Sequence, residues 1–203
     1  MNMDGTHTRP YDSPKRAAAA AETGRRILQA TEDLFLEGPL ADVTLNAVAA
    51  RAGVTVQTVI RRFGDRMGLI HATADAAAAR VAGQRNAARP GDVRAAVGNL
   101  LEHYETTGAL ALKMLAEEGT SPVMAEITAA GRQFHWQWCE RVFEPYLSES
   151  LFADKAARHR RLAQFVALCD VYTWKLLRLD AGLSRDQVAT SLLEMLGPFI
   201  RRH

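Results

Sequence analysis

Side chains that can hydrogen-bond to DNA bases are concentrated around one short segment of the chain. The amide of Gln57 can pair with adenine through two hydrogen bonds, and the guanidinium groups of Arg61 and Arg62 can bind guanine or phosphate. Threonine hydroxyls donate and accept, while an apolar side chain can touch the methyl group of thymine. If these residues share an exposed helical face, that face suits a major groove. The candidate DNA contacts are Thr44, Thr55, Val56, Gln57, Thr58, Ile60, Arg61, Arg62 and Arg66.

Two short helices joined by a tight turn would position these side chains. Thr44 precedes an apolar helical pattern that ends at Gly53, and Thr55 precedes a second one that ends at Phe63; threonine is a favoured N-cap residue. Gly53 fits the turn because glycine adopts a left-handed backbone at low cost. Val59 and Phe63 stand four residues apart and share one side of the second helix, which leaves its other side exposed. The spacing predicts a helix-turn-helix.

Positive charge accompanies this motif, although the whole chain has a formal net charge of only +2. Residues 1–89 are net positive and residues 90–203 net negative. The first N–H groups of the two helices favour phosphate, and Arg66 could hold the DNA backbone. A local basic patch on a near-neutral body is typical of an element that contacts phosphate. The alternative is an ordinary αα-turn whose cations are solvated.

Helical periodicity also covers the rest of the chain, and no pair of strands is visible. Residues 1–22 are predicted to be a flexible arm, although Ser13-Pro14 is a helix-start signal and the first helix could begin there or after Thr23. A Pro-Gly pair and an N-cap mark a domain boundary at Arg89–Asp92. Further helices are predicted at about 92–106, 109–118, 122–144, 154–180 and 184–201. We therefore predict an all-α fold of about nine helices, with a three-helix DNA-binding domain and its connecting helix at residues 23–89 and a second helical domain at residues 90–203.

A set of apolar, small and capping residues within 25–70 carries a resemblance to a known family: Ile27-Leu28, Ala30, Leu34-Phe35, Thr44-Leu45, Val48-Ala49, Ala52-Gly53-Val54-Thr55, Thr58-Val59, Arg61, Phe63, Asp65-Arg66 and Leu69. In these residues the N-terminal domain resembles the DNA-binding domain of the TetR family of bacterial transcriptional regulators. Three positions depart from the family pattern: Ile60 stands where an aromatic residue is usual, Arg62 where Tyr or His is frequent, and Met67 where an acidic residue is common. The resemblance implies a cytoplasmic homodimeric regulator, a repressor that binds a palindromic operator in double-stranded DNA and is released by a small-molecule effector.

The resemblance also implies a ligand pocket and a dimer interface in residues 90–203. Asp170 lies in an apolar run, so its carboxylate needs a partner, either an internal arginine or a cationic or hydroxyl-bearing ligand. The 154–180 segment is apolar around much of its girth, which together with the final helix predicts a homodimer interface through residues 154–201. Core packing is the alternative for each of these apolar or aromatic residues. The pocket candidates are Tyr104, Met114, Phe134, Trp138, Phe165, Asp170 and Trp174.

Other activities are not supported by the sequence. It contains no catalytic set, phosphate loop or nucleophile elbow, so we expect no enzyme, no catalytic residue and no cofactor. His135 and Cys139 are four residues apart but lack a second ligand pair, so we expect no metal. Apolar runs are too short or too rich in alanine to span a membrane. A DNA-binding regulator or architectural protein without a small-molecule ligand is the alternative function.

Overall fold

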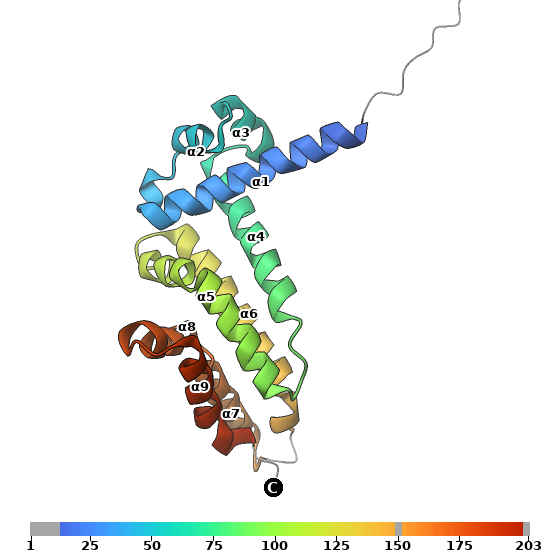
Figure 1. Cartoon of the computed structure of the whole chain (residues 1–203), viewed down its shortest axis with the longest axis vertical. Coiled ribbons are helices and arrows are strands. Elements are labelled where there is room, and N and C mark those ends of the chain that lie inside the picture. Colours follow the sequence, from blue (N-terminus) through green and yellow to red (C-terminus); the bar gives the residue numbers. More distant parts are fainter. Residues whose placement is uncertain (1–12, 149–151, 201–203) are drawn as a thin grey trace, which may run out of the picture. The chain divides into compact units, whose positions relative to one another are not determined.

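The computed structural model describes residues 13–148 and 152–200, and within these ranges all regular structure is helical (Figure 1). This confirms the predicted all-α fold. The chain divides into two compact units, residues 1–76 and residues 77–203, with the division inside α4. The elements are α1 Ser13–Glu37, η1 Leu40–Asp42, α2 Leu45–Ala52, α3 Val56–Phe63, α4 Arg66–Arg85, α5 Val93–Glu117, α6 Pro122–Val142, η2 Glu144–Tyr146, α7 Lys155–Leu168, α8 Val171–Lys175, the π-helical turn η4 Leu176–Asp180 and α9 Arg185–Ile200.

The first unit forms around one face of α1. Ile27, Ala30 and Phe35 recur at helical spacing and are all buried, so α1 presents a continuous apolar stripe to the rest of the unit. Val48 and Val59 are fully buried and come from α2 and α3, respectively. Burial of these aliphatic side chains fixes the two short helices on a longer one, because helices of this length are marginal on their own.

The first helix begins earlier than the predicted arm allows. α1 starts at Ser13, so residues 13–22 are helical and only residues 1–12 of the predicted arm lie outside the described residues. The reason is local propensity, because the alanine run of residues 17–21 favours a helix more strongly than the single Gly24 opposes it. Of the two starts that the sequence leaves open, Ser13 is the one adopted.

The second unit has an aromatic core. The rings of Phe143 and Phe165 stack with centroids 4.1 Å apart, and the edge of Trp138 meets Phe143. α5 runs unbroken through Gly108, where the sequence predicts a gap between two helices. A Cβ at Gly108 would lie 2.5 Å from the Trp174 ring, so the missing side chain lets α8 approach α5 closely. Glycine here serves close packing, and it does not end the helix.

The predicted single helix over residues 154–180 is wrong, because it is interrupted at Asp170. The Asp170 carboxylate accepts a hydrogen bond from the backbone N–H of Tyr172 at 2.9 Å and so starts α8 as an N-cap. α7 ends at Leu168, and α8 passes into the π-helical turn η4. An acidic residue in an apolar run thus has a local backbone partner.

Within the described ranges, no helix is long and apolar enough to cross a membrane.

Candidate nucleic-acid interface

α2 and α3 form a helix-turn-helix with both starts capped by threonine. Thr44 Oγ1 accepts from the N–H of Ala47 at 3.1 Å, and Thr55 Oγ1 accepts from the N–H of Thr58 at 3.2 Å. Gly53 ends α2 in the left-handed region, at φ 64° and ψ 42°. This is the conformation that the sequence assigns to the turn, and it favours glycine. The turn and the caps fix the direction in which α3 leaves α2.

The outer face of α3 carries the side chains that could read DNA. Val59 is fully buried, whereas Gln57, Ile60, Arg61 and Arg62 are exposed. Ile60 is 38% exposed, which makes it available for apolar contact with a base methyl group. The structure therefore brings the candidate residues of α3 together on one face, although Val56 and Thr58 are only half-exposed.

The threonine hydroxyls are less free than their positions in the sequence imply. Thr55 Oγ1 and Thr58 Oγ1 lie 2.9 Å apart and share a hydrogen bond, in addition to the cap that Thr55 supplies. Thr44 is exposed but likewise occupied as a cap. Because these oxygens already have backbone or side-chain partners, their first role is to shape the motif.

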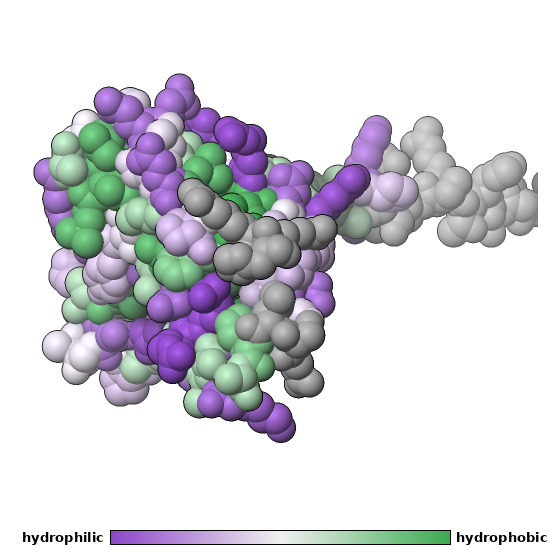
Figure 2. Space-filling view, turned by 90° about the horizontal axis from the view of Figure 1, so that it is seen from below, coloured by the Kyte–Doolittle hydropathy of each residue, from purple (hydrophilic) through white to green (hydrophobic). Residues whose placement is uncertain are grey.

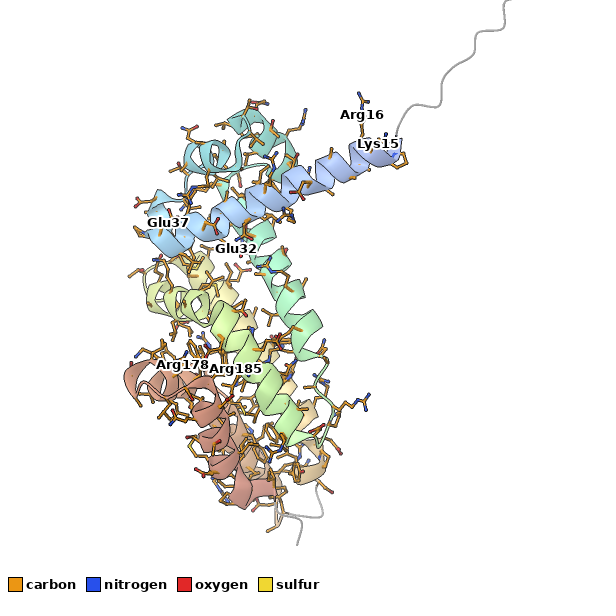
Figure 3. The ribbon with its side chains drawn as sticks, viewed as in Figure 1. Lys15, Arg16, Glu32, Glu37, Arg178 and Arg185 are labelled. Atoms are coloured by element: carbon orange, nitrogen blue, oxygen red, sulfur yellow. The ribbon has the colours of Figure 1, made fainter. Side chains whose placement is uncertain are left out.

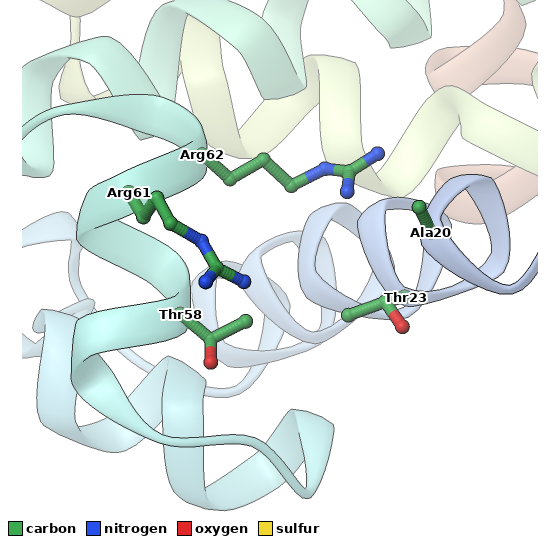
Figure 4. A pocket seen from close by; sticks show the side chains of 5 residues that line it. All are labelled: Ala20, Thr23, Thr58, Arg61 and Arg62. Atoms are coloured by element: carbon green, nitrogen blue, oxygen red, sulfur yellow. The ribbon is translucent and has the colours of Figure 1, made fainter. Parts of the chain in front are cut away.

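Arg61 and Arg62 line a hollow between α3 and the first half of α1, together with Thr58, Ala20 and Thr23 (Figure 4). Both arginine side chains reach from α3 toward α1. The guanidinium carbon of Arg62 also lies 5.9 Å from the Phe63 ring centroid. Within the described part of the chain, neither arginine is held in an ion pair, so both charges face the solvent. A concave basic surface of this kind fits a phosphate backbone or a guanine edge.

Gly24 provides the surface on which Arg62 lies. A Cβ at this position would stand 2.5 Å from Arg62 Nη2 and 2.7 Å from its Cζ, and the glycine itself is buried. α1 thus determines where the Arg62 guanidinium can sit. The sequence indicates Gly24 only as an interruption of the first helix, so its role depends on a contact across the fold. Lys15 and Arg16 lie at the start of the same helix, whereas Glu32 and Glu37 lie toward its end (Figure 3).

We expect Gly24→Ala to weaken DNA binding by a few-fold without loss of stability. The new methyl group displaces the Arg62 guanidinium, and alanine raises helix stability by about 1 kcal/mol relative to glycine. Affinity for a selected operator, measured by fluorescence anisotropy, and the melting temperature check the two effects. Gly83→Ala is the matched control, because a Cβ at Gly83 of α4 meets nothing within 4 Å. Equal operator affinities for the two variants would contradict this role of Gly24.

Two arginines near the helix-turn-helix, Arg51 and Arg66, have partners inside the protein. Arg51 donates to both carboxylate oxygens of Glu37 at 2.8 and 2.6 Å, and this contact lowers the pKa of Glu37. Arg66 Nε donates to the carbonyl of Val43 at 2.7 Å, and its Nη2 donates to the carbonyl of Leu40. These bonds tie the start of α4 to η1, and a contact of Arg66 with the DNA backbone stays a prediction. The exposed cations of α3 are Arg61 and Arg62.

The pocket candidates of the second unit are mostly core residues. Tyr104, Trp138, Phe165 and Trp174 are each at most 5% exposed, while Met114, Phe134 and Asp170 are half-buried. The Tyr104 hydroxyl donates to the Cys169 carbonyl at 2.9 Å, and Trp174 Nε1 donates to Glu105 Oε1 at 3.1 Å. These contacts agree with the core-packing alternative. The sequence predicts an internal arginine or a ligand as the partner of the Asp170 carboxylate. In the structure this carboxylate caps α8, so the backbone N–H of Tyr172 is its partner.

One buried charged residue of this unit is not predicted by the sequence. Arg85 ends α4 with only 2% of its surface exposed, and its Nη2 lies 3.1 Å from His135 Nδ1. An arginine at the end of an alanine-rich helix carries no signal of burial in the sequence, because its neighbours come from α6.

Among the described residues, no group of three or more His, Cys, Asp or Glu side chains could hold a metal ion.

Comparison with known proteins agrees with this geometry. Residues 27–73, which contain the second half of α1, then η1, α2 and α3, and the start of α4, match the family described as bacterial regulatory proteins, tetR family. No curated protein matches the chain. A solved structure of a transcriptional regulator from Rhodococcus sp. Rha1 is similar in fold, with a TM-score of 0.65 and 18% sequence identity. The similarity covers 87% of this chain and 95% of that one.

Proposed function

We propose that this chain acts as a homodimeric repressor. The premise is its membership of the tetR family of bacterial regulatory proteins, which rests on residues 27–73 and makes it a DNA-binding transcriptional regulator. The observation that carries the DNA-contact proposal is the exposed outer face of α3. Gln57, Ile60, Arg61 and Arg62 are exposed on it, while Val59 anchors the opposite side. α3 enters a major groove and reads base edges with Gln57 and Arg61.

The remaining side chains set the register of α3 on the duplex. Arg62 contacts phosphate from its position on Gly24, and the half-exposed Val56 and Thr58 make short-range contacts near the helix start. Thr44 and Thr55 lie at the two helix starts, whose N–H groups favour a phosphate oxygen. Arg66 supports the motif from within the unit, and its contact with the DNA backbone stays a prediction.

We infer a dimer through residues 154–201 from an apolar cluster in that range. Tyr172, Leu176 and Leu179 are 51%, 60% and 53% exposed, and they follow one another on α8 and η4. On the face that Figure 2 shows, hydrophobic and hydrophilic residues are mixed. Three large exposed apolar side chains in eight residues are typical of a surface that a second protein covers. Two-fold symmetry would present two copies of α3 to a palindromic operator.

We expect Leu176→Glu to convert the dimer into a monomer. A carboxylate placed at the centre of an apolar contact leaves a buried charge without a partner, which costs several kcal/mol on association. Sedimentation velocity at micromolar concentration measures the change. Leu36→Glu is the matched control, because Leu36 is 45% exposed on α1, outside residues 154–201. A wild-type monomer, or a Leu176→Glu variant that stays dimeric, would contradict the proposed interface.

The repressor role and its release by a small molecule are the remaining parts of the proposal. The support is the combination of a DNA-binding head with a second, independently packed unit of residues 77–203. In vitro transcription from a promoter that contains the selected operator tests the direction of control. Purified protein should reduce the transcript, whereas an increase would make the protein an activator. A transcript that no small molecule restores would favour the alternative, a regulator without such a ligand.

A further inference from the structure

The first turns of α1 project beyond the core of the DNA-binding unit. Residues 14–22 are all exposed, and the first buried residue described in this helix is Gly24. The consecutive alanines of residues 17–21 give the exposed stretch a high helix propensity, so it stays helical although nothing packs over it. At 1.5 Å per residue, residues 14–22 form a thin rod about 14 Å long. The core of the unit makes no use of this rod.

Charge is distributed unevenly along α1. Within this helix, the charged residues that precede Glu22 are Lys15 and Arg16, and both are cationic and exposed. Glu22 itself is paired with Arg25, with 2.6 Å between carboxylate oxygen and guanidinium nitrogen. The acidic residues that Figure 3 labels on α1 lie toward its opposite end. The part of the helix that projects from the core is therefore its positive end.

The exposed stretch lies beside the outer face of α3. The hollow that holds Arg61 and Arg62 of α3 has α1 as its other wall, and Ala20 and Thr23 supply that wall (Figure 4). Arg16 stands four residues before Ala20, which places both on the same side of α1. The Arg16 side chain extends from α1 on the side where α3 lies (Figure 3). Arg16 and the two arginines of α3 thus face the same side of the unit.

We propose that residues 14–22 are a second DNA-binding element, in which Lys15 and Arg16 contact phosphates of the strand that borders the groove entered by α3. The inference rests on the proposed function, because it takes α3 to lie in a major groove. One DNA strand carries a charge about every 3.4 Å along the axis, so a rod about 14 Å long passes several phosphates. Alanine side chains are short, so the rod can approach the duplex closely while the longer cationic side chains reach the phosphate oxygens.

The composition of this element favours DNA over a membrane or a protein partner. A helix that binds a membrane surface needs bulky apolar side chains on one face, and residues 14–22 contain none larger than alanine and proline. A protein interface is anchored by large aromatic or aliphatic residues, which are equally absent from this range. The element offers positive charge next to a hollow that two further arginines line. Contacts of this kind bind the DNA backbone without reading its sequence.

Lys15→Ala combined with Arg16→Ala tests the proposal in the full-length protein. Each lost phosphate contact lowers the slope of log affinity against log salt by about 0.9, so this double variant should lose about 1.8 per bound subunit and at least about tenfold in affinity at physiological salt. Affinities for the selected operator and for a scrambled duplex should fall by the same factor, because phosphate contacts carry no sequence information. Fluorescence anisotropy over a series of salt concentrations measures both quantities.

The charge-matched control is Arg89→Ala combined with Arg94→Ala, which removes two exposed cations from the second unit. This control should keep the wild-type salt slope. An unchanged slope in the variant of Lys15 and Arg16, or equal losses in the two double variants, would overturn the proposal. A loss confined to the operator would assign the two side chains to base edges, and it would overturn their role as phosphate contacts.

Ethylation of single phosphates locates the contact on the DNA. Ethylation should weaken binding of the wild type at phosphates of each half-site, and at least one of these positions should no longer matter to the variant of Lys15 and Arg16. An interference pattern identical to that of the wild type would overturn the proposal.

A proline in the exposed stretch distinguishes a DNA-binding element from a structural one. Ala18→Pro unwinds the turn that precedes it, so Lys15 and Arg16 keep their charges but lose their places on α1. Operator affinity should fall, whereas the melting temperature should stay at the wild-type value, because no residue from 14 to 22 is buried. A marked drop in melting temperature would show that the stretch holds the unit together. That result, or wild-type operator affinity, would overturn the proposal.

Arg61→Ala separates failure of this inference from failure of the proposed function. If Arg61→Ala loses operator affinity while the variant of Lys15 and Arg16 binds as the wild type does, α3 reads DNA and the role given to α1 is wrong. If neither substitution changes operator affinity, both the inference and the proposed contacts of α3 are wrong. The account predicts a loss in both, with a lower salt slope in the variant of Lys15 and Arg16.

Discussion

Arg61→Ala is expected to reduce operator affinity by roughly ten- to a hundredfold, because one bidentate contact with a base contributes about 1–3 kcal/mol of discrimination. The side chain is exposed on α3, and it reaches toward α1 without a partner that would fix it elsewhere (Figure 4). Fluorescence anisotropy with the selected operator and with a scrambled duplex measures the loss. Specific binding should fall more than non-specific binding if Arg61 reads a base.

The salt dependence distinguishes the two kinds of contact that Arg61 could make. Loss of one phosphate contact lowers the slope of log affinity against log salt by about 0.9, whereas loss of a base contact leaves that slope nearly unchanged. We expect the second result for Arg61→Ala and the first for Arg62→Ala. Arg89→Ala is the charge-matched control, because Arg89 is exposed in the second unit. If Arg61→Ala binds the operator as tightly as the wild type does, the DNA must contact another surface of the protein.

Gly68→Ala is expected to destabilise the DNA-binding unit by about 3 kcal/mol, which lowers the melting temperature by about 6–12 °C. A Cβ at Gly68 would lie 2.1 Å from the carbonyl oxygen of Phe63, a backbone atom that cannot rotate away. Gly68 also donates its N–H to Asp65 Oδ1 at 2.8 Å, so the first turn of α4 cannot shift without losing its cap. Differential scanning calorimetry measures the effect.

The control for Gly68→Ala is a glycine-to-alanine substitution at a position where the new methyl group meets no other atom. Gly83→Ala on the same helix should keep or slightly raise the melting temperature, because alanine is the better helix former and nothing opposes its methyl group. Gly68→Ala should also lose operator affinity, since the carbonyl it displaces ends α3. Equal melting temperatures for the two variants would mean that the α3–α4 junction adapts, and the packing argument would fail.

The helix-turn-helix could be predicted from the sequence because its determinants are local. Thr44, Gly53 and Thr55 act within three or four residues of their partners, through caps and a left-handed turn. The side on which Val59 lies follows from helical spacing alone. Residue types and spacing were therefore sufficient for the motif and for the exposed face of α3, which is the part of the site with the strongest support.

The contacts that the sequence does not reveal join residues that are distant in the sequence. Arg66 bonds to carbonyls more than twenty residues earlier, and Arg85 meets His135 fifty residues later; neither pairing leaves a periodic signal. Gly108 reads as a helix breaker until the Trp174 ring is seen beside it. Asp170 was the local exception, because its role as a cap could have been recognised from its position before a short helical segment.

The central claim is that two copies of α3 read one symmetric DNA site, and selection of binding sites from a random double-stranded DNA pool tests it most directly. The experiment uses the full-length protein and sequences the retained DNA. The account predicts a palindrome whose half-sites are centred one or more helical turns apart, at about 34 Å per turn, and its loss from the pool retained by Arg61→Ala. A non-palindromic motif, or retained DNA without any shared sequence, would contradict it.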